Sequence, residues 1–210
     1  MRLYLSSQRL GTAPGELVSL LDGRTRIAVI ANAADDVPPT KRRGRVEREI
    51  ADLREIGLDP SEIDLRDHFG ELDQARSTLE DFDAVWVLGG NVVVVRTAFH
   101  ESGADKVISD RLRDDSIVFA GYSAGPCMLG PRAPLWDEVF DGGLEGYPDT
   151  FVTTGLEILP FAIAPHYGRE PGCAGGTPVA DHYIDNHVPF IALRDGQALV
   201  INGAIRRVVE

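Results

Sequence analysis

Short apolar runs alternate with amphipathic segments through the first 130 residues, and this alternation restricts the fold more than any other feature of the chain. Continuous runs of Val, Ile and Leu of this length suit strands buried on both faces, as in parallel sheets. The four runs span residues 2–5, 26–31, 84–88 and 116–122. Strands and helices in alternation predict a mostly parallel central sheet covered by helices, which is a three-layer α/β/α fold.

The segments between these runs have helical spacing. Val46, Ile50 and Leu53 fall on one face of a helix predicted over 45–56. Further helices are predicted over 72–79 and, as one or two, within 92–113. The last 55 residues predict strands at 161–164, 190–193, 198–201 and 205–209, with Asp195-Gly196 as a hairpin turn between the second and third of these. At 210 residues, the chain is expected to form a single domain over 1–210.

Charge and composition exclude several classes of protein. The net charge of −12 argues against nucleic-acid binding, and the basic run at 41–45 is interpreted as the solvated start of a helix. No run approaches the roughly 18 apolar residues of a membrane span, and the N-terminus lacks the features of a signal peptide. Two cysteines, Cys127 and Cys173, do not indicate a disulfide scaffold. A cytoplasmic location without a membrane partner is expected.

The sequence Gly-Tyr-Ser-Ala-Gly at 121–125 is the most informative motif. An apolar strand leads into Ser123, and Cys127 begins a segment that resembles a buried helix. A nucleophile elbow needs this strand-turn-helix context, with small residues on both sides of the serine. Ser123 is therefore the candidate nucleophile, and the N–H of Ala124 is a candidate oxyanion donor. An ordinary turn with a helix-capping serine is the alternative.

A second glycine turn, Gly89-Gly90-Asn91, follows the preceding predicted strand. Ends of parallel strands lie side by side, so this turn is expected to face Ser123, with the Gly90 N–H as a second oxyanion donor. Neither turn matches the glycine patterns that bind nucleotides.

A serine hydroxyl needs a general base. His166 follows an apolar segment and is placed at a strand end, which makes it the first candidate; His182 and His187 are the alternatives. The carboxylate that would orient the histidine is not selected by spacing. Its candidates between serine and histidine are Asp137, Glu138, Asp141, Glu145, Asp149 and Glu157. No motif for a metal or another cofactor is present.

These segments together resemble the peptidase E family of serine peptidases, which includes aspartyl dipeptidases and, more distantly, cyanophycinases. The matching pieces are Leu5-Ser6-Ser7, Leu-Gly-Gly-Asn at 88–91, the serine motif and Pro165-His166-Tyr167, in this order. The resemblance implies a fold similar to class I glutamine amidotransferases. It also implies Ser123 as nucleophile, His166 as base, Gly90 and Ala124 as the oxyanion hole, and Glu138 as the acid, with Asp137 beside it.

The expected function is a serine peptidase acting on small peptides, dipeptidase-like and with Asp-X dipeptides among the candidate substrates. Asn91 and Arg169 are candidates for substrate binding, and Arg169 is equally compatible with a surface role. The protein is expected to be a monomer or homodimer without a cofactor. The alternatives are an esterase or amidase on a small non-peptide substrate, a non-catalytic binding module of the same fold, or a protein that binds a phosphorylated ligand at the glycine turns.

Overall fold

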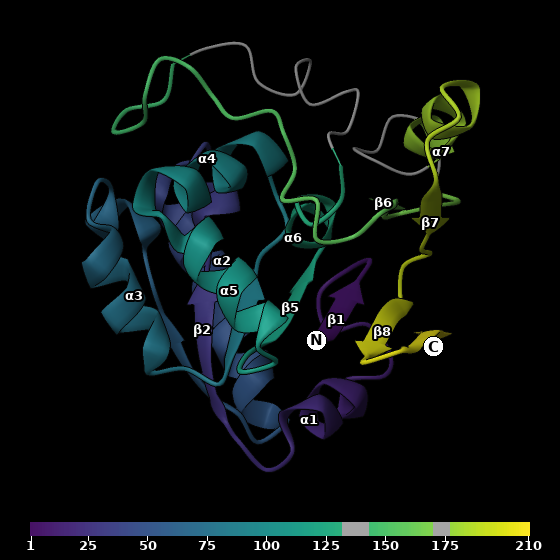
Figure 1. Ribbon diagram of the computed structural model, residues 1–210, viewed down its shortest axis with the longest axis horizontal. Helices are drawn as coiled ribbons and strands as arrows, with labels where there is room; N and C mark the ends of the chain where they lie inside the picture. The colour runs from purple at the N-terminus through teal and green to yellow at the C-terminus, as the bar shows by residue number, and fades with distance from the viewer. Residues whose placement is uncertain (132–142, 170–176) are drawn as a thin grey trace.

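The computed structural model describes residues 1–131, 143–169 and 177–210. Within them, seven strands form one sheet in the order β3-β2-β4-β5-β1-β8-β9 (Figure 1). Their bounds are β1 Arg2–Ser6, β2 Arg26–Ile30, β3 Asp59–Glu62, β4 Ala84–Val87, β5 Val118–Tyr122, β8 Ala198–Asn202 and β9 Ile205–Val209. The first five strands in this order are parallel, whereas β8 and β9 run antiparallel to their neighbours. The predicted mostly parallel α/β sheet is confirmed.

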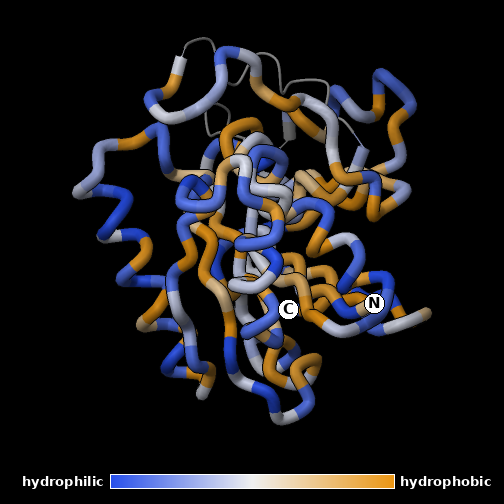
Figure 2. The backbone as a smooth tube through the Cα atoms, turned by 60° about the vertical axis from the view of Figure 1, so that its left-hand side comes forward, coloured by the Kyte–Doolittle hydropathy of each residue, from blue (hydrophilic) through white to orange (hydrophobic). Residues whose placement is uncertain are grey.

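Helices cover both faces of this sheet. They are α1 Gly15–Leu21, α2 Pro39–Glu55, α3 Leu72–Glu80, α4 Val92–Ser102, α5 Ala104–Arg113 and α6 Ala124–Cys127, and two 3-10 turns are η1 Asn32–Ala34 and η2 Leu65–His68. Helix α7, Thr177–Asp185, instead packs against two strands outside this sheet, β6 (Ala162–Ala164) and β7 (Phe190–Ala192). Apolar residues of α1 and α2 pack on one face of the sheet, and those of α3 to α6 pack on the other. Figure 2 shows the hydrophobic stretches gathered around the strands, while helices alternate between hydrophobic and hydrophilic residues. The three predicted layers are therefore present.

The helix predicted over 45–56 begins earlier, at Pro39. Proline suits the first turn of a helix, because the backbone N–H that it lacks would have no partner there. The region 92–113 forms two helices, α4 and α5, which are separated by Gly103 at φ 75°. Two elements have no strong sequence pattern and were not predicted. Helix α1 has only 7 residues, and β3 is the polar edge strand Asp-Pro-Ser-Glu.

The predicted hairpin at Asp195-Gly196 is wrong. Strand β7 (Phe190–Ala192) pairs in parallel with β6 (Ala162–Ala164) in a separate two-stranded sheet. Strand β8 instead pairs with β1 and β9 in the main sheet. The segment around Asp195 therefore crosses from one sheet to the other, because the strands before and after it pair with different partners.

The carboxyl ends of β1, β4 and β5 lie at one edge of the sheet, because these strands are parallel neighbours. Ser7, the turn at Gly89-Gly90 and Ser123 directly follow these three strands. This edge is where α/β sheets place their ligand sites. In the part of the chain that the structure describes, no helix is long and apolar enough to cross a membrane.

Candidate active site

Ser123 lies in a strained turn between β5 and α6. Its φ of 54° and ψ of −106° are unusual for a residue with a side chain. The turn is tight: a Cβ atom at Gly125 would lie 2.8 Å from the carbonyl oxygen of Val87 in β4. Such a turn raises the serine hydroxyl above the end of the strand, which is the geometry of a nucleophile elbow.

His166 is the histidine that meets this serine. Its ring Nε2 lies 3.0 Å from the Ser123 Oγ. The residue follows β6, has a φ of 60° and is 8% exposed. Tyr167, the next residue, donates its N–H to the Leu193 carbonyl over 3.0 Å, which ties the turn to the chain after β7. Ser123 and His166 lie within hydrogen-bond distance, although His166 follows a strand of the separate two-stranded sheet and not, as the sequence predicted, a strand end of the main sheet.

The other ring nitrogen of His166 contacts Asp195. Its Nδ1 lies 2.7 Å from Oδ1 of this carboxylate. The second oxygen of Asp195 accepts a hydrogen bond from the Arg169 Nε. Burial by itself raises the pKa of Asp195, but hydrogen bonds from His166, Arg169 and Ser7 outweigh it and hold that pKa below its ordinary value. A carboxylate held ionised against Nδ1 is the partner that orients and stabilises a catalytic imidazole.

The sequence prediction missed Asp195, because this residue lies beyond His166, whereas all the predicted acids lie between Ser123 and His166. Glu138, the acid implied by the resemblance, lies outside the described residues together with Asp137 and Asp141. Of the described candidates, Glu145, Asp149 and Glu157 make no hydrogen bond to His166. One feature of the sequence indicates Asp195 as a candidate acid, namely its position just after a predicted strand. The same position was predicted to be a hairpin turn.

The remaining histidines have other surroundings. His68 and His100 bond to Gln74 and Asp105 respectively, at 2.9 and 3.3 Å. His182 lies in α7, and His187 follows that helix. Of the five histidines, the structure brings His166 to within hydrogen-bond distance of Ser123.

The turn at Gly89-Gly90 faces the serine across the sheet edge. Gly90 has a φ of 152°, and a Cβ atom there would lie 2.1 Å from the Ala33 carbonyl oxygen. Within the described residues, the N–H groups of Gly90 and Ala124 donate to no acceptor. An oxyanion hole is formed by two such N–H groups, so Gly90 and Ala124 stay the candidate donors.

Asn91 holds this turn in place. Its side-chain oxygen accepts hydrogen bonds from the N–H groups of Val93 and Val94 at 3.1 and 3.3 Å, which caps α4. Its amide group donates to Asp36 over 3.0 Å, and its backbone N–H donates to Ala33 over 2.7 Å. The side chain proposed for substrate binding is thus engaged in positioning the glycine turn.

A hollow of about 520 Å³ opens at Ser123, and four of its lining side chains are arginines. Two come from the surroundings of β1 and β6, and two come from α2. The lining residues are Gln8, Arg9, Arg45, Arg48, Gly89, Gly90, Tyr122, Ser123, His166 and Arg169. Arg45 makes no ion pair with any described residue. The other three arginines lie within ion-pair distance of carboxylates, Arg9 and Arg48 of Glu49 and Arg169 of Asp195, so part of the positive charge of this hollow is offset.

Glu49 anchors α2 beneath this hollow. Its carboxylate is fully buried and accepts hydrogen bonds from Trp86 Nε1 at 3.1 Å and from the Tyr122 hydroxyl at 3.3 Å. The same carboxylate lies 3.6 Å from Arg9 and 3.7 Å from Arg48. Burial, together with the charge of Glu49, raises the pKa of Tyr122, which keeps that hydroxyl a hydrogen-bond donor. These contacts fix α2 to β4 and β5.

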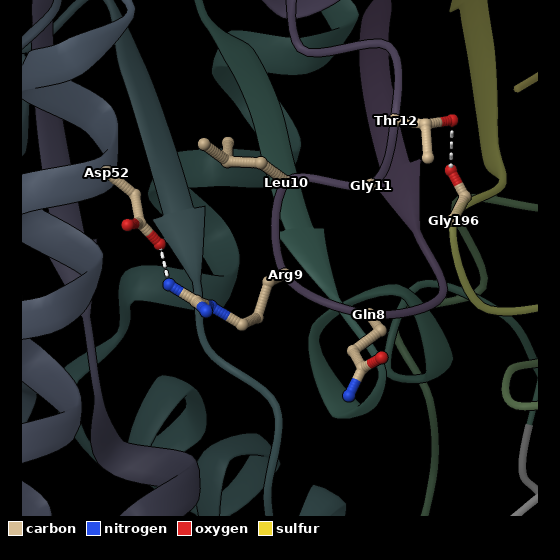
Figure 3. A pocket seen from close by; sticks show the side chains of 7 residues that line it. All are labelled: Gln8, Arg9, Leu10, Gly11, Thr12, Asp52 and Gly196. Carbon is tan, nitrogen blue, oxygen red and sulfur yellow. Dashed lines mark hydrogen bonds and ion pairs between the residues drawn. The ribbon is translucent and has the colours of Figure 1, made fainter.

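A second hollow, of about 430 Å³, adjoins the first along Gln8 and Arg9. Figure 3 shows the Arg9 side chain extended toward Asp52 of α2, with which it forms an ion pair. On the opposite side, Thr12 donates to the Gly196 carbonyl over 3.1 Å (Figure 3). The loop after β1 therefore forms a wall shared by both hollows. Among the described residues, no group of three or more His, Cys, Asp or Glu side chains is arranged to hold a metal ion.

A protein family, a curated protein and solved structures are similar to this chain. The model of peptidase family S51 matches residues 8–209. A curated relative, the uncharacterized peptidase Lin0382 of Listeria innocua serovar 6a, is 27% identical over 119 residues. This match spans 57% of the present chain and 54% of the relative, which is about half the length of that protein.

Two solved structures share the fold. A candidate peptidase E protein from Listeria monocytogenes EGD-e superposes with a TM-score of 0.76 at 19% identity, covering 100% of this chain and 98% of that one. A peptidase from an acI-B1 Actinobacterium superposes with a TM-score of 0.71 at 16% identity, covering 99% of this chain and 86% of that one. The resemblance inferred from the sequence motifs is confirmed.

Proposed function

Because this chain belongs to peptidase family S51, we propose that it is a serine peptidase that hydrolyses small peptides through Ser123, His166 and Asp195. One observation carries the proposal, namely the continuous hydrogen-bond chain from Ser123 through His166 to Asp195, at 3.0 and 2.7 Å. Nucleophile, base and orienting carboxylate in this order form the arrangement that activates a serine hydroxyl.

In the acylation step, the Ser123 Oγ attacks the carbonyl carbon of the scissile amide while His166 Nε2 takes the hydroxyl proton. The negative charge that develops on the carbonyl oxygen is bound by the N–H groups of Gly90 and Ala124. Losing one such donor costs ~3–4 kcal/mol of transition-state stabilisation in comparable sites. Asp195 holds the proton on Nδ1, so that Nε2 is free to act as the base.

His166 then gives its proton to the leaving amine, and the C–N bond breaks to leave an acyl-serine ester. In the deacylation step, His166 removes a proton from water, and the resulting hydroxide attacks the ester carbonyl. Collapse of the second tetrahedral intermediate releases the acid product and returns the proton to Ser123. Each half-reaction uses the same base and the same pair of N–H donors.

The charge of the hollow supports a substrate that carries carboxylates. Arg9, Arg45 and Arg48 line the space beside Ser123, and guanidinium groups bind carboxylates with two parallel hydrogen bonds. A short peptide with an acidic side chain, such as an Asp-X dipeptide, presents two carboxylates in a small volume. We propose such peptides as the preferred substrates.

Arg169 has a second role in this proposal. It lines the hollow, and its Nε donates a hydrogen bond to Asp195. Part of its guanidinium group is therefore already used by that carboxylate. We propose that it chiefly keeps Asp195 ionised, and that substrate carboxylates are bound by the arginines of α2. The cytoplasmic location expected from the sequence stays a prediction.

The test combines labelling with turnover. A fluorophosphonate reagent is expected to modify Ser123 in the wild-type protein and to leave Ser123→Ala unlabelled, as located by peptide mass spectrometry. Asp-X dipeptides are expected to be hydrolysed faster than matched Asn-X dipeptides and short acyl esters. Faster ester cleavage would favour the esterase alternative, and absence of labelling would favour a non-catalytic binding module.

A further inference from the structure

Ser7, the residue that follows β1, is a buried polar side chain with contacts in the site. It is 0% exposed, and its hydroxyl makes three hydrogen-bond contacts. The His166 backbone N–H donates to its Oγ over 2.8 Å, and the same Oγ lies 3.0 Å from the Asp195 Oδ1 and 3.2 Å from the Leu193 carbonyl oxygen. One hydroxyl thus contacts the base, the carboxylate and the chain that leads to the carboxylate.

Because the Ser7 hydroxyl has a single proton, it can donate to only one of its two acceptors at a time. A hydroxyl has one hydrogen to donate and two lone pairs. The His166 N–H uses a lone pair, while Asp195 and the Leu193 carbonyl compete for the single hydrogen. The Asp195 contact is the shorter of the two, and hydrogen bonds to ionised acceptors are stronger. The Ser7 hydroxyl therefore donates chiefly to Asp195.

The fold explains why this contact matters. Ser123 follows β5, which pairs directly with β1, as in the register pair Leu5 and Gly121. His166 and Asp195 instead follow β6 and β7, which form a separate two-stranded sheet. Ser7 is fixed to the main sheet, and its backbone N–H also donates to Gln197 over 2.9 Å. Its hydroxyl joins the part of the chain that holds the nucleophile to the segments that hold the base and the acid.

We propose that Ser7 is a positioning residue of this site, whose hydroxyl sets the places of the His166 backbone and the Asp195 carboxylate relative to Ser123. This inference rests on the proposed peptidase function, which it extends to a residue from the opposite end of the chain. The hydrogen bond from Ser7 is also one of the interactions that hold the pKa of Asp195 below its ordinary value.

The experiment compares Ser7→Ala with Ser6→Ala. Ser6 is a matched control, since it is the same residue type, is 0% exposed, and its hydroxyl contacts the Gln8 carbonyl rather than His166 or Asp195. For Ser7→Ala, kcat is expected to fall about 10- to 100-fold, with KM changed less than about threefold, as for loss of a hydrogen bond to a charged group. Ser6→Ala is expected to keep kcat within about threefold of wild type.

A double-mutant cycle tests whether Ser7 acts through Asp195. If it does, Ser7→Ala is expected to cost little further activity in an Asp195→Asn background, because residues that act as a unit are not additive. Full additivity, a wild-type kcat in Ser7→Ala, or an equal loss in Ser6→Ala would overturn the inference.

A measurement without turnover separates this inference from the proposed function. Titration of the Asp195 side-chain carboxyl by carbon NMR is expected to give a higher pKa in Ser7→Ala than in wild type, and an unchanged pKa in Ser6→Ala. An Asp195 titration unaffected by Ser7→Ala would overturn the inference even if Ser123 is the nucleophile. Active Ser123→Ala protein would overturn the peptidase mechanism instead. If Ser7→Ala does not fold, Ser7→Cys, which keeps the side-chain size and donates weakly, is measured in its place.

Discussion

Nδ1 of His166 lies 2.7 Å from Oδ1 of Asp195, a carboxylate placed 29 residues further along the chain. The proposed nucleophile, base and acid therefore occur in the order serine, histidine, aspartate. The same triad geometry arises on unrelated folds with other chain orders, so the roles follow from the contacts and not from sequence position.

Asp195→Asn is expected to lower kcat about 10³- to 10⁴-fold while the protein stays folded, because an amide cannot hold the His166 tautomer that the base requires. Steady-state kinetics on a dipeptide and circular dichroism provide the measurement. Asp149→Asn, an exposed residue without contact to His166, is the control. A large loss in Glu138→Gln with a nearly active Asp195→Asn would assign the acid to Glu138 instead.

Gly90→Ala is expected to reduce kcat about 10²- to 10³-fold, the range for loss of one oxyanion donor. The added Cβ would lie 2.1 Å from the Ala33 carbonyl oxygen, so the turn must move and its N–H moves with it. Labelling of Ser123 and peptide kinetics measure the effect. Gly15→Ala serves as the control, since a Cβ there meets nothing within 4 Å. Equal kinetics in the two variants would exclude Gly90 as an oxyanion donor.

Arg45→Met is expected to raise KM for Asp-X dipeptides about 10- to 100-fold with little change in kcat, because a charged hydrogen bond to the substrate carboxylate is lost. The same KM is expected to rise with ionic strength in the wild-type protein. Arg43→Met, an exposed position on the same helix that does not line the hollow, is the control. If KM for Asn-X dipeptides rose equally, Arg45 would not recognise the negative charge of the substrate side chain.

Asp64→Asn is expected to destabilise the protein at neutral pH but not in strong acid. Burial raises the pKa of Asp64, but hydrogen bonds from Arg66 and Asn32 outweigh it and lower this pKa to about 2. A pKa lowered in the folded state stabilises the fold above the unfolded value and loses that effect as pH falls through the folded value. The side chain is 20% exposed, and the shift corresponds to about 2 kcal/mol near pH 7.

Urea unfolding of wild type and Asp64→Asn at pH 7 and at pH 2.5 tests this expectation. The difference in unfolding free energy is expected to shrink at the lower pH. Asp67→Asn, an exposed neighbour, is expected to show no such change. A difference that is the same at both pH values would mean that the ion pairs of Asp64 do not determine its stabilising effect.

The sequence by itself determined the layered α/β architecture and indicated Ser123 as the candidate nucleophile. Buried strands and amphipathic helices have characteristic local periods, and the elbow around Ser123 requires small residues at fixed offsets. The turn at Gly90 was visible for the same reason. Each of these features depends on only a few consecutive residues.

Only the tertiary structure decided which distant residues complete the site. Ser7 accepts a hydrogen bond from His166, which is 159 residues further along the chain. Asp195 lies on a segment that connects the two sheets. The arginines of α2 reach the hollow because Glu49 bonds to Trp86 and Tyr122 of the neighbouring strands. Local periodicity does not encode the order of strands in a sheet, and it is this order that sets which loop ends become neighbours.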